Sequence, residues 1–175
     1  MYIPDAKQHR SFKMIATQMI QSQNGESFSG SKGLLDWQLS CQPEQNVVLL
    51  QTSGPIDKTS FPAMLAAAVA AMDHHQCSRL LGDHRNSALK LDPLEIYYAP
   101  RVIIASGASA GYSVALVFPE ITEDLQFMEN VCRNSGLHLA VFTDVNGALQ
   151  WFSASTKPLT TPPHSARGDA EKSNG

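Results

Sequence analysis

The fold is decided by Arg79-Leu-Leu-Gly-Asp-His-Arg85, a short apolar run followed directly by three ionisable residues. The run predicts a buried strand that ends at Asp83, and the next helix is expected to begin at Asp92. In open α/β sheets, the loops that leave the carboxyl ends of parallel strands converge at one edge, where ligands bind. We therefore interpret Asp83, His84 and Arg85 as candidate site residues at such an edge.

Strand-like and helix-like patterns alternate on both sides of this stretch. Upstream, two apolar runs flank a short polar turn, which predicts an antiparallel hairpin. Downstream, strands alternate with helices, and such crossovers make the strands parallel. The predicted fold class is α/β, with the element order ββαβαβαβα and a mostly parallel five-stranded sheet whose first strand is antiparallel. The strands are expected at 35–41, 47–52, 79–83, 113–118 and 137–142, and the helices at 60–74, at 93–106 and after the N-caps Thr122 and Asp144.

Two of these strands, at 47–50 and 114–118, are continuously apolar. Continuous runs of this kind are typical of strands that are buried on both faces. We expect the three crossover helices to cover one face of the sheet. The other face is then left to the N-terminal segment, the final helix or a partner subunit.

Composition divides the chain into three zones. Residues 1–33 are interpreted as an N-terminal extension, either a short amphipathic helix or a frayed segment, with a flexible Gly/Ser-rich linker at 22–33. Residues 34–155 form the predicted domain. The tail at 156–175 is rich in Pro and has almost no large apolar residue, so we expect it to be disordered.

Charge and cysteine content exclude several classes of function. A formal net charge of -3 with dispersed Lys and Arg offers no basic stripe, which argues against nucleic acid as a partner. Cys41, Cys77 and Cys132 form no CxxC pair, which argues against a disulfide framework and a structural zinc site and favours a cytoplasmic location. No run has the pattern of a signal peptide or a membrane span. We expect neither a metal nor a cofactor.

The first crossover helix carries no charged residue from Thr59 to Met72. One interpretation is a close-packed face for a protein partner or for a second copy of the chain, around Phe61 to Met72. The other is that its many Ala residues simply serve as good helix formers.

Several stretches together resemble a known family: Val47-Val-Leu-Leu-Gln-Thr-Ser-Gly54, Arg79–Arg85, Phe127-Met-Glu-Asn-Val-Cys-Arg-Asn-Ser-Gly136, Val141-Phe-Thr-Asp144 and Ala148-Leu-Gln-Trp151. In this order they resemble the bacterial STAS-like domains, which share a fold with anti-sigma-factor antagonists and CRAL-TRIO lipid-transfer domains. The resemblance implies a five-stranded α/β domain that regulates by binding.

In the antagonist branch of that family, phosphorylation switches a serine in an Asp-Ser-Ser-Gly-type turn between a strand and a helix. The corresponding stretch here is Asp83-His-Arg-Asn-Ser-Ala88, which lacks the Ser-Gly pair. Ser87 is the nearest match and hence the candidate phosphosite. Because the pair is missing, we predict no stoichiometric phosphorylation there.

Spacing suggests how the ionisable residues are arranged. Asp83 and Arg85 alternate along an extended chain, so they are expected to point the same way and to form a bidentate ion pair, with His84 facing opposite. The pair either braces the loop or presents Arg85 to an anionic group. Glu120 and Asp144 follow the next two strands and are expected at the same edge.

Two further features have competing interpretations. Tyr97 is expected either to pack in the core with its hydroxyl outward or to line a cleft for an apolar chain with an anionic head. The segment Gly107-Ala-Ser-Ala-Gly111 matches the G-x-S-x-G pattern of a nucleophile elbow, which needs a strand before the serine and a helix after it. The predicted order is the reverse, so we interpret the segment as a loop.

These patterns predict a non-enzymatic STAS-like regulatory or protein-interaction module that forms a homodimer. The alternative is a binder or carrier of a small apolar or anionic ligand, held between helix 93–106 and the sheet. A serine hydrolase using Ser109 is a remote alternative. The candidate residues for binding a ligand or partner are Asp83, His84, Arg85, Ser87, Tyr97, Glu120 and Asp144.

Overall fold

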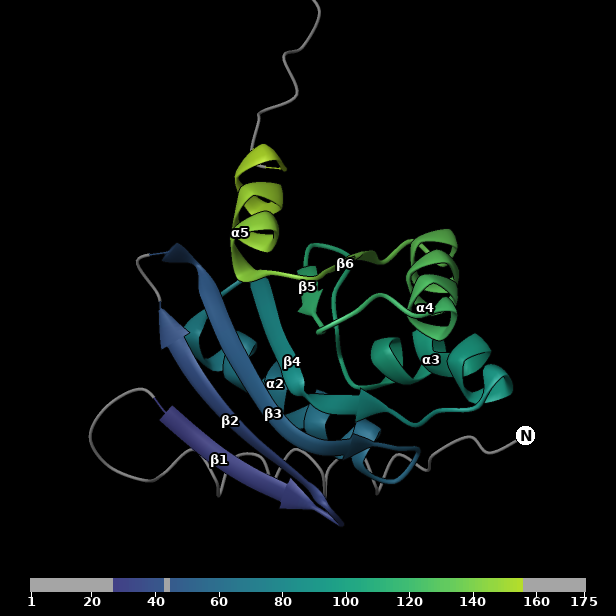
Figure 1. Ribbon diagram of the computed structural model, residues 1–175. Helices are drawn as coiled ribbons and strands as arrows, with labels where there is room; N and C mark the ends of the chain where they lie inside the picture. Colours follow the sequence, from purple (N-terminus) through teal and green to yellow (C-terminus); the bar gives the residue numbers. More distant parts are fainter. Residues whose placement is uncertain (1–26, 43–44, 156–175) are drawn as a thin grey trace, which may run out of the picture.

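Six strands form one mixed sheet in the order β1-β2-β3-β4-β5-β6, which is also their order along the chain (Figure 1). The computed structural model describes residues 27–42 and 45–155. β1, β2 and β3 pair in antiparallel fashion, whereas β3 to β6 are parallel. The predicted α/β fold is confirmed. The elements are β1 (Ser27–Lys32), β2 (Leu35–Gln42), β3 (Val47–Ile56), α2 (Ser60–His75), β4 (Arg79–Leu89), α3 (Pro93–Ala105), β5 (Ser113–Val117), α4 (Glu123–Asn134), β6 (His138–Phe142) and α5 (Val145–Ala154).

The sheet has one strand more than predicted, because β1 lies within the stretch interpreted as a linker. Its Phe28 packs against the core. Gly30 makes room for the indole of Trp37 on β2, since a Cβ at this glycine would lie 2.6 Å from Trp37 Cε2. The linker prediction is therefore wrong for residues 27–32, where a glycine accommodates a neighbouring ring instead of loosening the chain. The predicted N-terminal helix, the rest of the linker up to residue 26 and the tail at 156–175 lie outside the described residues.

Helices α2, α3 and α4 cover one face of the sheet, as predicted, and α5 lies on the other (Figure 1). When successive parallel strands advance in one direction, right-handed crossovers place every connecting helix on the same side. The larger core lies on this side and includes Leu50, Leu80 and Leu116. On the opposite side, Ala148 and Phe152 of α5 join a smaller core over β4, β5 and β6.

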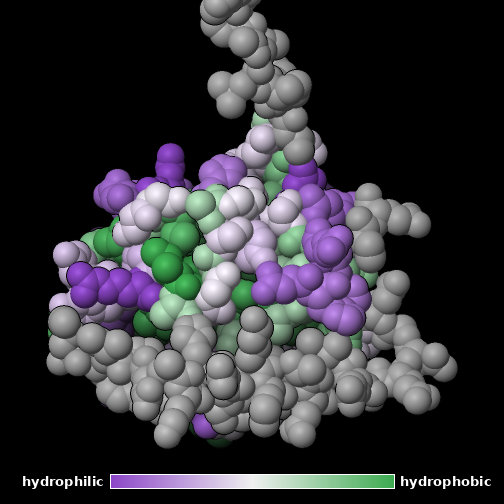
Figure 2. Space-filling model, turned by 180° about the vertical axis from the view of Figure 1, so that it is seen from behind, coloured by the Kyte–Doolittle hydropathy of each residue, from purple (hydrophilic) through white to green (hydrophobic). Residues whose placement is uncertain are grey.

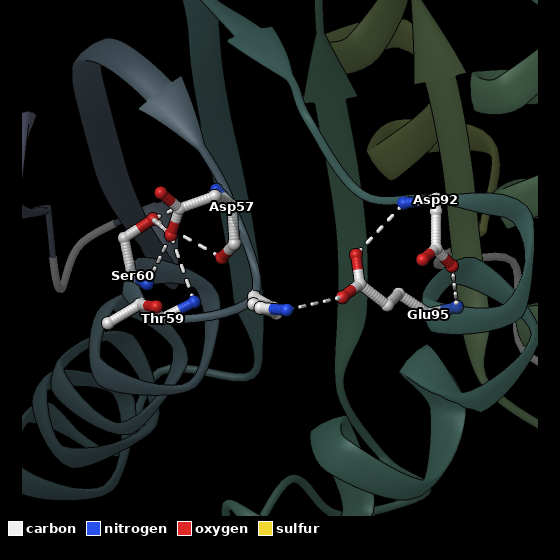
Figure 3. Close-up of polar contacts among 6 residues, drawn as sticks. Asp57, Thr59, Ser60, Asp92 and Glu95 are labelled. Atoms are coloured by element: carbon white, nitrogen blue, oxygen red, sulfur yellow. Dashed lines mark hydrogen bonds and ion pairs between the residues drawn. The ribbon is translucent and has the colours of Figure 1, made fainter.

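Short-range hydrogen bonds fix the beginnings of α2 and α3 (Figure 3). Asp57 Oδ1 accepts the backbone N–H of Ser60 at 2.9 Å, and this contact is the main reason why the pKa of Asp57 is lowered. Asp92 and Glu95 form a capping box, with Glu95 N–H donating to Asp92 at 2.8 Å and Asp92 N–H to Glu95 at 2.9 Å. Lys58 lies 3.9 Å from Glu95 and links the two helix starts. These carboxylates are engaged in capping.

Strand β4 is longer than predicted and continues to Leu89. From Arg79 to Asp83 it lies between β3 and β5, but β5 ends at Val117, which is in register with Asp83. Among the described residues, the rest of β4 pairs only with β3. The prediction that the strand ends at Asp83 is wrong, but Asp83 marks the level at which the neighbouring strand ends.

Candidate ligand site

An irregularity in β4 near Asp83, where the neighbouring strand β5 ends, determines which side chains meet there. β3 advances by two residues, from Gln51 to Ser53, while β4 advances by three, over 83–86. The extra residue makes a β-bulge, which shifts the alternation of side chains between the two faces of a sheet. As a result, both His84 and Ser87 turn toward Thr52 of β3.

Thr52 connects the other two side chains by hydrogen bonds. Its Oγ1 lies 2.7 Å from His84 Nδ1 and 2.6 Å from Ser87 Oγ. Each hydroxyl can donate only one hydrogen bond, so the protons of Ser87, Thr52 and His84 can be arranged in two consistent ways. If Ser87 donates to Thr52 and Thr52 to Nδ1, the ring proton is on Nε2. If Nδ1 donates to Thr52 and Thr52 to Ser87, Nε2 is an acceptor.

The His84 ring is only 2% exposed and is neutral near pH 7. Burial lowers its pKa to about 4, which outweighs the opposite effect of the Asp83 carboxylate. The ring centroid lies 4.9 Å from that of Phe118, and a Cβ at Gly82 would come within 2.5 Å of Nε2. Among the described residues, Nε2 forms no hydrogen bond. This nitrogen is therefore available to a ligand.

An apolar cavity with a volume of about 60 Å³ lies between the sheet and helices α2 to α4, and the side chain of His84 is part of its lining. It follows β5, where Val114 and Leu116 line it, and continues to Phe118 beside His84. A single water needs roughly 10–15 Å³ of such space, so the cavity has room for several waters without any movement of its walls. Most of the lining is apolar. Among the described lining residues, nitrogen or oxygen atoms in side chains are present in His84, Ser109, Tyr112 and His138.

Asp83 and Arg85 form the predicted bidentate ion pair. Arg85 Nε and Nη2 donate to the two carboxylate oxygens of Asp83 at 2.8 Å each. These hydrogen bonds are the largest cause of the lowered pKa of Asp83. Arg85 is exposed to solvent, and neither residue lines the cavity. The structure therefore separates this pair from His84, although the three residues are consecutive in sequence.

Three other candidates lie away from the cavity or at its rim. Asp144 Oδ1 accepts the backbone N–H of Gly147 at 2.9 Å and so caps α5, as predicted. Glu120 is exposed in the connection between β5 and α4. Ser109 lies in the loop between α3 and β5, so a helix precedes it and a strand follows, as predicted, and this order is the reverse of a nucleophile elbow.

Tyr97 is 56% exposed on α3 and does not line the cavity. The prediction of core packing is therefore wrong, whereas the prediction that Tyr97 lines a cleft for a ligand stays a prediction. The physical reason is helical phase: Ile96, Ala99 and Ile103 form the buried side of α3, which places Tyr97 on the opposite side.

Sequence analysis did not single out Thr52 and Gly82. Gly82 does carry a signal, because a glycine inside an apolar strand often marks the close approach of another group. Thr52 gives no local signal, since His84 and Ser87 lie 32 and 35 residues further along the chain.

The uncharged helix α2 is covered within its own chain. No residue of it from 60 to 72 is exposed, and its buried side chains include Phe61, Met64 and Met72. The other residues of this stretch are buried or partly buried, and homodimerisation through α2 stays a prediction. Figure 2 shows a group of hydrophobic side chains left of the centre of the coloured area, with hydrophilic side chains on the right and along the outer edges.

Comparisons with known proteins do not assign the chain to a family. No protein-family model matches the chain, and no curated protein matches it. The resemblance to STAS-like domains stays a prediction. Within residues 27–42 and 45–155, no helix is long and apolar enough to cross a membrane, and no cluster of three or more His, Cys, Asp or Glu side chains is placed to hold a metal ion.

Proposed function

We propose that this chain binds a small, neutral and mainly apolar ligand in the cavity between the sheet and helices α2 to α4. The observation that carries the proposal is the position of His84. Its ring lines an apolar cavity, its Nδ1 is held by Thr52, and its Nε2 has no hydrogen-bond partner among the described residues. Mainly apolar pockets with a few fixed polar groups are typical of small-molecule sites.

The lining of the cavity favours a neutral ligand over an anionic one. Among residues 27–42 and 45–155, no Lys, Arg, Asp or Glu lines the cavity. A charged headgroup placed there would lose its hydration without gaining a counter-charge, and burying an unpaired charge is costly. The His84 imidazole, with a pKa of about 4, supplies no positive charge near pH 7.

The hydrogen-bond chain through Thr52 supports a ligand with one hydroxyl or carbonyl group. Because the protons along these hydrogen bonds can be arranged in two ways, Nε2 can accept a hydrogen bond from a ligand hydroxyl or donate one to a ligand carbonyl oxygen. In either case the ligand would pair with the His84 ring nitrogen that has no hydrogen-bond partner among the described residues.

Phenol, toluene and benzoate test this proposal, because the three molecules have similar size and differ in polarity and charge. A ring of this size needs a cavity of about 150 Å³, so its binding requires the cavity walls to move apart. Binding is measured by chemical-shift changes of the cavity-lining methyl groups in NMR spectra and by the shift of the melting temperature. We expect phenol and toluene to bind and benzoate not to bind. In His84→Leu, phenol should lose affinity while toluene should keep it, because only phenol uses Nε2.

Two loop variants serve as a matched pair. Ala108 lines the cavity and is half-buried, whereas Ala110, two positions further along, is exposed and does not line it. We expect Ala108→Phe to weaken the binding of both neutral probes and Ala110→Phe to leave it unchanged. If no neutral probe binds the wild-type protein, or if benzoate binds as well as phenol does, the proposed function is wrong.

A further inference from the structure

Two cysteines that are far apart in sequence meet in the core. Cys41 lies on β2, and Cys77 lies two residues beyond the end of α2. Their Sγ atoms are 3.4 Å apart, and both side chains are buried. The contact lies outside the cavity, so it is independent of the proposed ligand site.

Backbone geometry holds both cysteines in place. Cys41 is fixed by its pairing with Val48 in the β2–β3 ladder. On the other side, Gln76 adopts a left-handed conformation with φ 54°, and the N–H groups of Gln76 and Cys77 bond back to Asp73 and Met72. This pattern is a Schellman motif, which ends a helix with a defined geometry. The two thiols therefore face each other because of the fold.

We propose that Cys41 and Cys77 form a reversible disulfide when the protein meets hydrogen peroxide. A disulfide has an S–S distance of about 2.05 Å, so the two sulfurs would have to approach by about 1.4 Å. One thiol, as thiolate, attacks peroxide and becomes a sulfenic acid with release of hydroxide, which takes up the thiol proton as water. The second sulfur then displaces the sulfenic oxygen as a second water. Overall, two thiols and one peroxide give one disulfide and two waters, and the two electrons from sulfur reduce the O–O bond.

The test is to treat the purified full-length chain with hydrogen peroxide, alkylate the remaining thiols after denaturation, and map the peptides by mass spectrometry. We expect a cross-linked peptide pair containing Cys41 and Cys77, with the loss of two hydrogen atoms from the intact protein. Dithiothreitol should reverse the change. The oxidised protein should melt at a higher temperature than the reduced protein, because the cross-link restricts the unfolded chain.

Cys132 provides the internal control. It is also buried, on α4, and burial raises the pKa of its thiol to about 12. Cys132→Ser should form the same cross-link as the wild type, whereas Cys41→Ser and Cys77→Ser should form no intramolecular disulfide. The proposal is overturned if peroxide leaves both thiols open to alkylation, converts either one to sulfinic acid without a cross-link, or joins either one to Cys132. Because the cross-link is mapped in the wild-type protein, the result does not depend on the folding of the variants.

Discussion

Asp83 and His84 are adjacent residues with opposite environments. Asp83 pairs with Arg85, which is exposed, and its charge is retained because the guanidinium lowers its pKa. His84 is buried on the helix-covered side and loses its charge because burial lowers its pKa. The comparison shows that neighbouring ionisable residues can have different roles. Asp83 and Arg85 form an ion pair that reaches solvent, whereas His84 is a neutral polar group inside an apolar region.

The two environments also imply different contributions to the free energy of unfolding. The ion pair is partly exposed, since 52% of the Arg85 side chain and 11% of the Asp83 side chain are accessible to solvent. A pair that water reaches contributes little, because water screens its charges and ordering two side chains costs entropy. A buried polar group that loses its partner costs more, because nothing replaces the lost hydrogen bond. Four predictions test this difference, from the largest expected effect to the smallest.

The first prediction concerns pH. The pKa of His84 is about 4 in the folded protein and about 6.5 when unfolded, so between these values the unfolded chain binds a proton that the native protein does not. Stability should therefore fall as the pH is lowered from 6.5 to 4, by up to about 3 kcal/mol. Urea unfolding at pH 7 and at pH 4 measures the effect. In His84→Leu this part of the pH dependence should disappear; an unchanged dependence would contradict a buried neutral imidazole.

The second prediction concerns the space for the ring. In Gly82→Ala the new methyl group would meet His84 Nε2 at 2.5 Å and Leu116 Cδ2 at 3.0 Å, so the ring must move away from Thr52. We expect a loss of about 2 kcal/mol in the free energy of unfolding, measured in urea. Gly147→Ala is the control, since its nearest contact would be 3.4 Å and the position is helical. That variant should be as stable as the wild type or more so.

The third prediction concerns the hydroxyl of Thr52. Thr52→Val keeps the shape of the side chain but leaves His84 Nδ1 without its partner, at a cost of about 1–2 kcal/mol in urea unfolding. Nitrogen-15 NMR of the imidazole should also change, because the tautomer is no longer held by the hydroxyl chain. Ser53→Ala, at the exposed neighbouring position, should change neither quantity. If Thr52→Val behaves like Ser53→Ala, the chain does not orient the ring.

The fourth and smallest effect is expected for the ion pair. Asp83→Asn removes the charge that pairs with Arg85, and the midpoint of urea unfolding should decrease only slightly. The difference from the wild type should shrink further in high salt, because ions screen exposed charges. A loss larger than that of Thr52→Val would reverse the comparison drawn above.

Local patterns predict local structure well in this chain. The N-caps Thr122 and Asp144 are confirmed by hydrogen bonds to Leu125 and Gly147. The pairing of Asp83 with Arg85 follows from strand alternation alone, since the two residues are two positions apart. These features depend on neighbours within a few residues, so the sequence contains the necessary information.

Contacts between distant segments were not predictable in the same way. Thr52 reaches His84 only because β3 and β4 pair in a particular register with a bulge, and no short pattern encodes that register. The meeting of Cys41 with Cys77 likewise depends on how the end of α2 packs against β2. The residues of the candidate site come from several strands and helices, so the site follows from the assembled sheet.

The unequal length of β4 and its neighbour has a consequence for hydrogen exchange. From Arg79 to Asp83 the strand is hydrogen-bonded on both sides, but beyond Asp83 it has β3 alone among the described residues. Backbone amides of the second half should exchange with solvent sooner, because opening them disrupts one ladder instead of two. His84 and Ser87 lie in this half, so the cavity can open locally beside His84 while the central sheet stays protected.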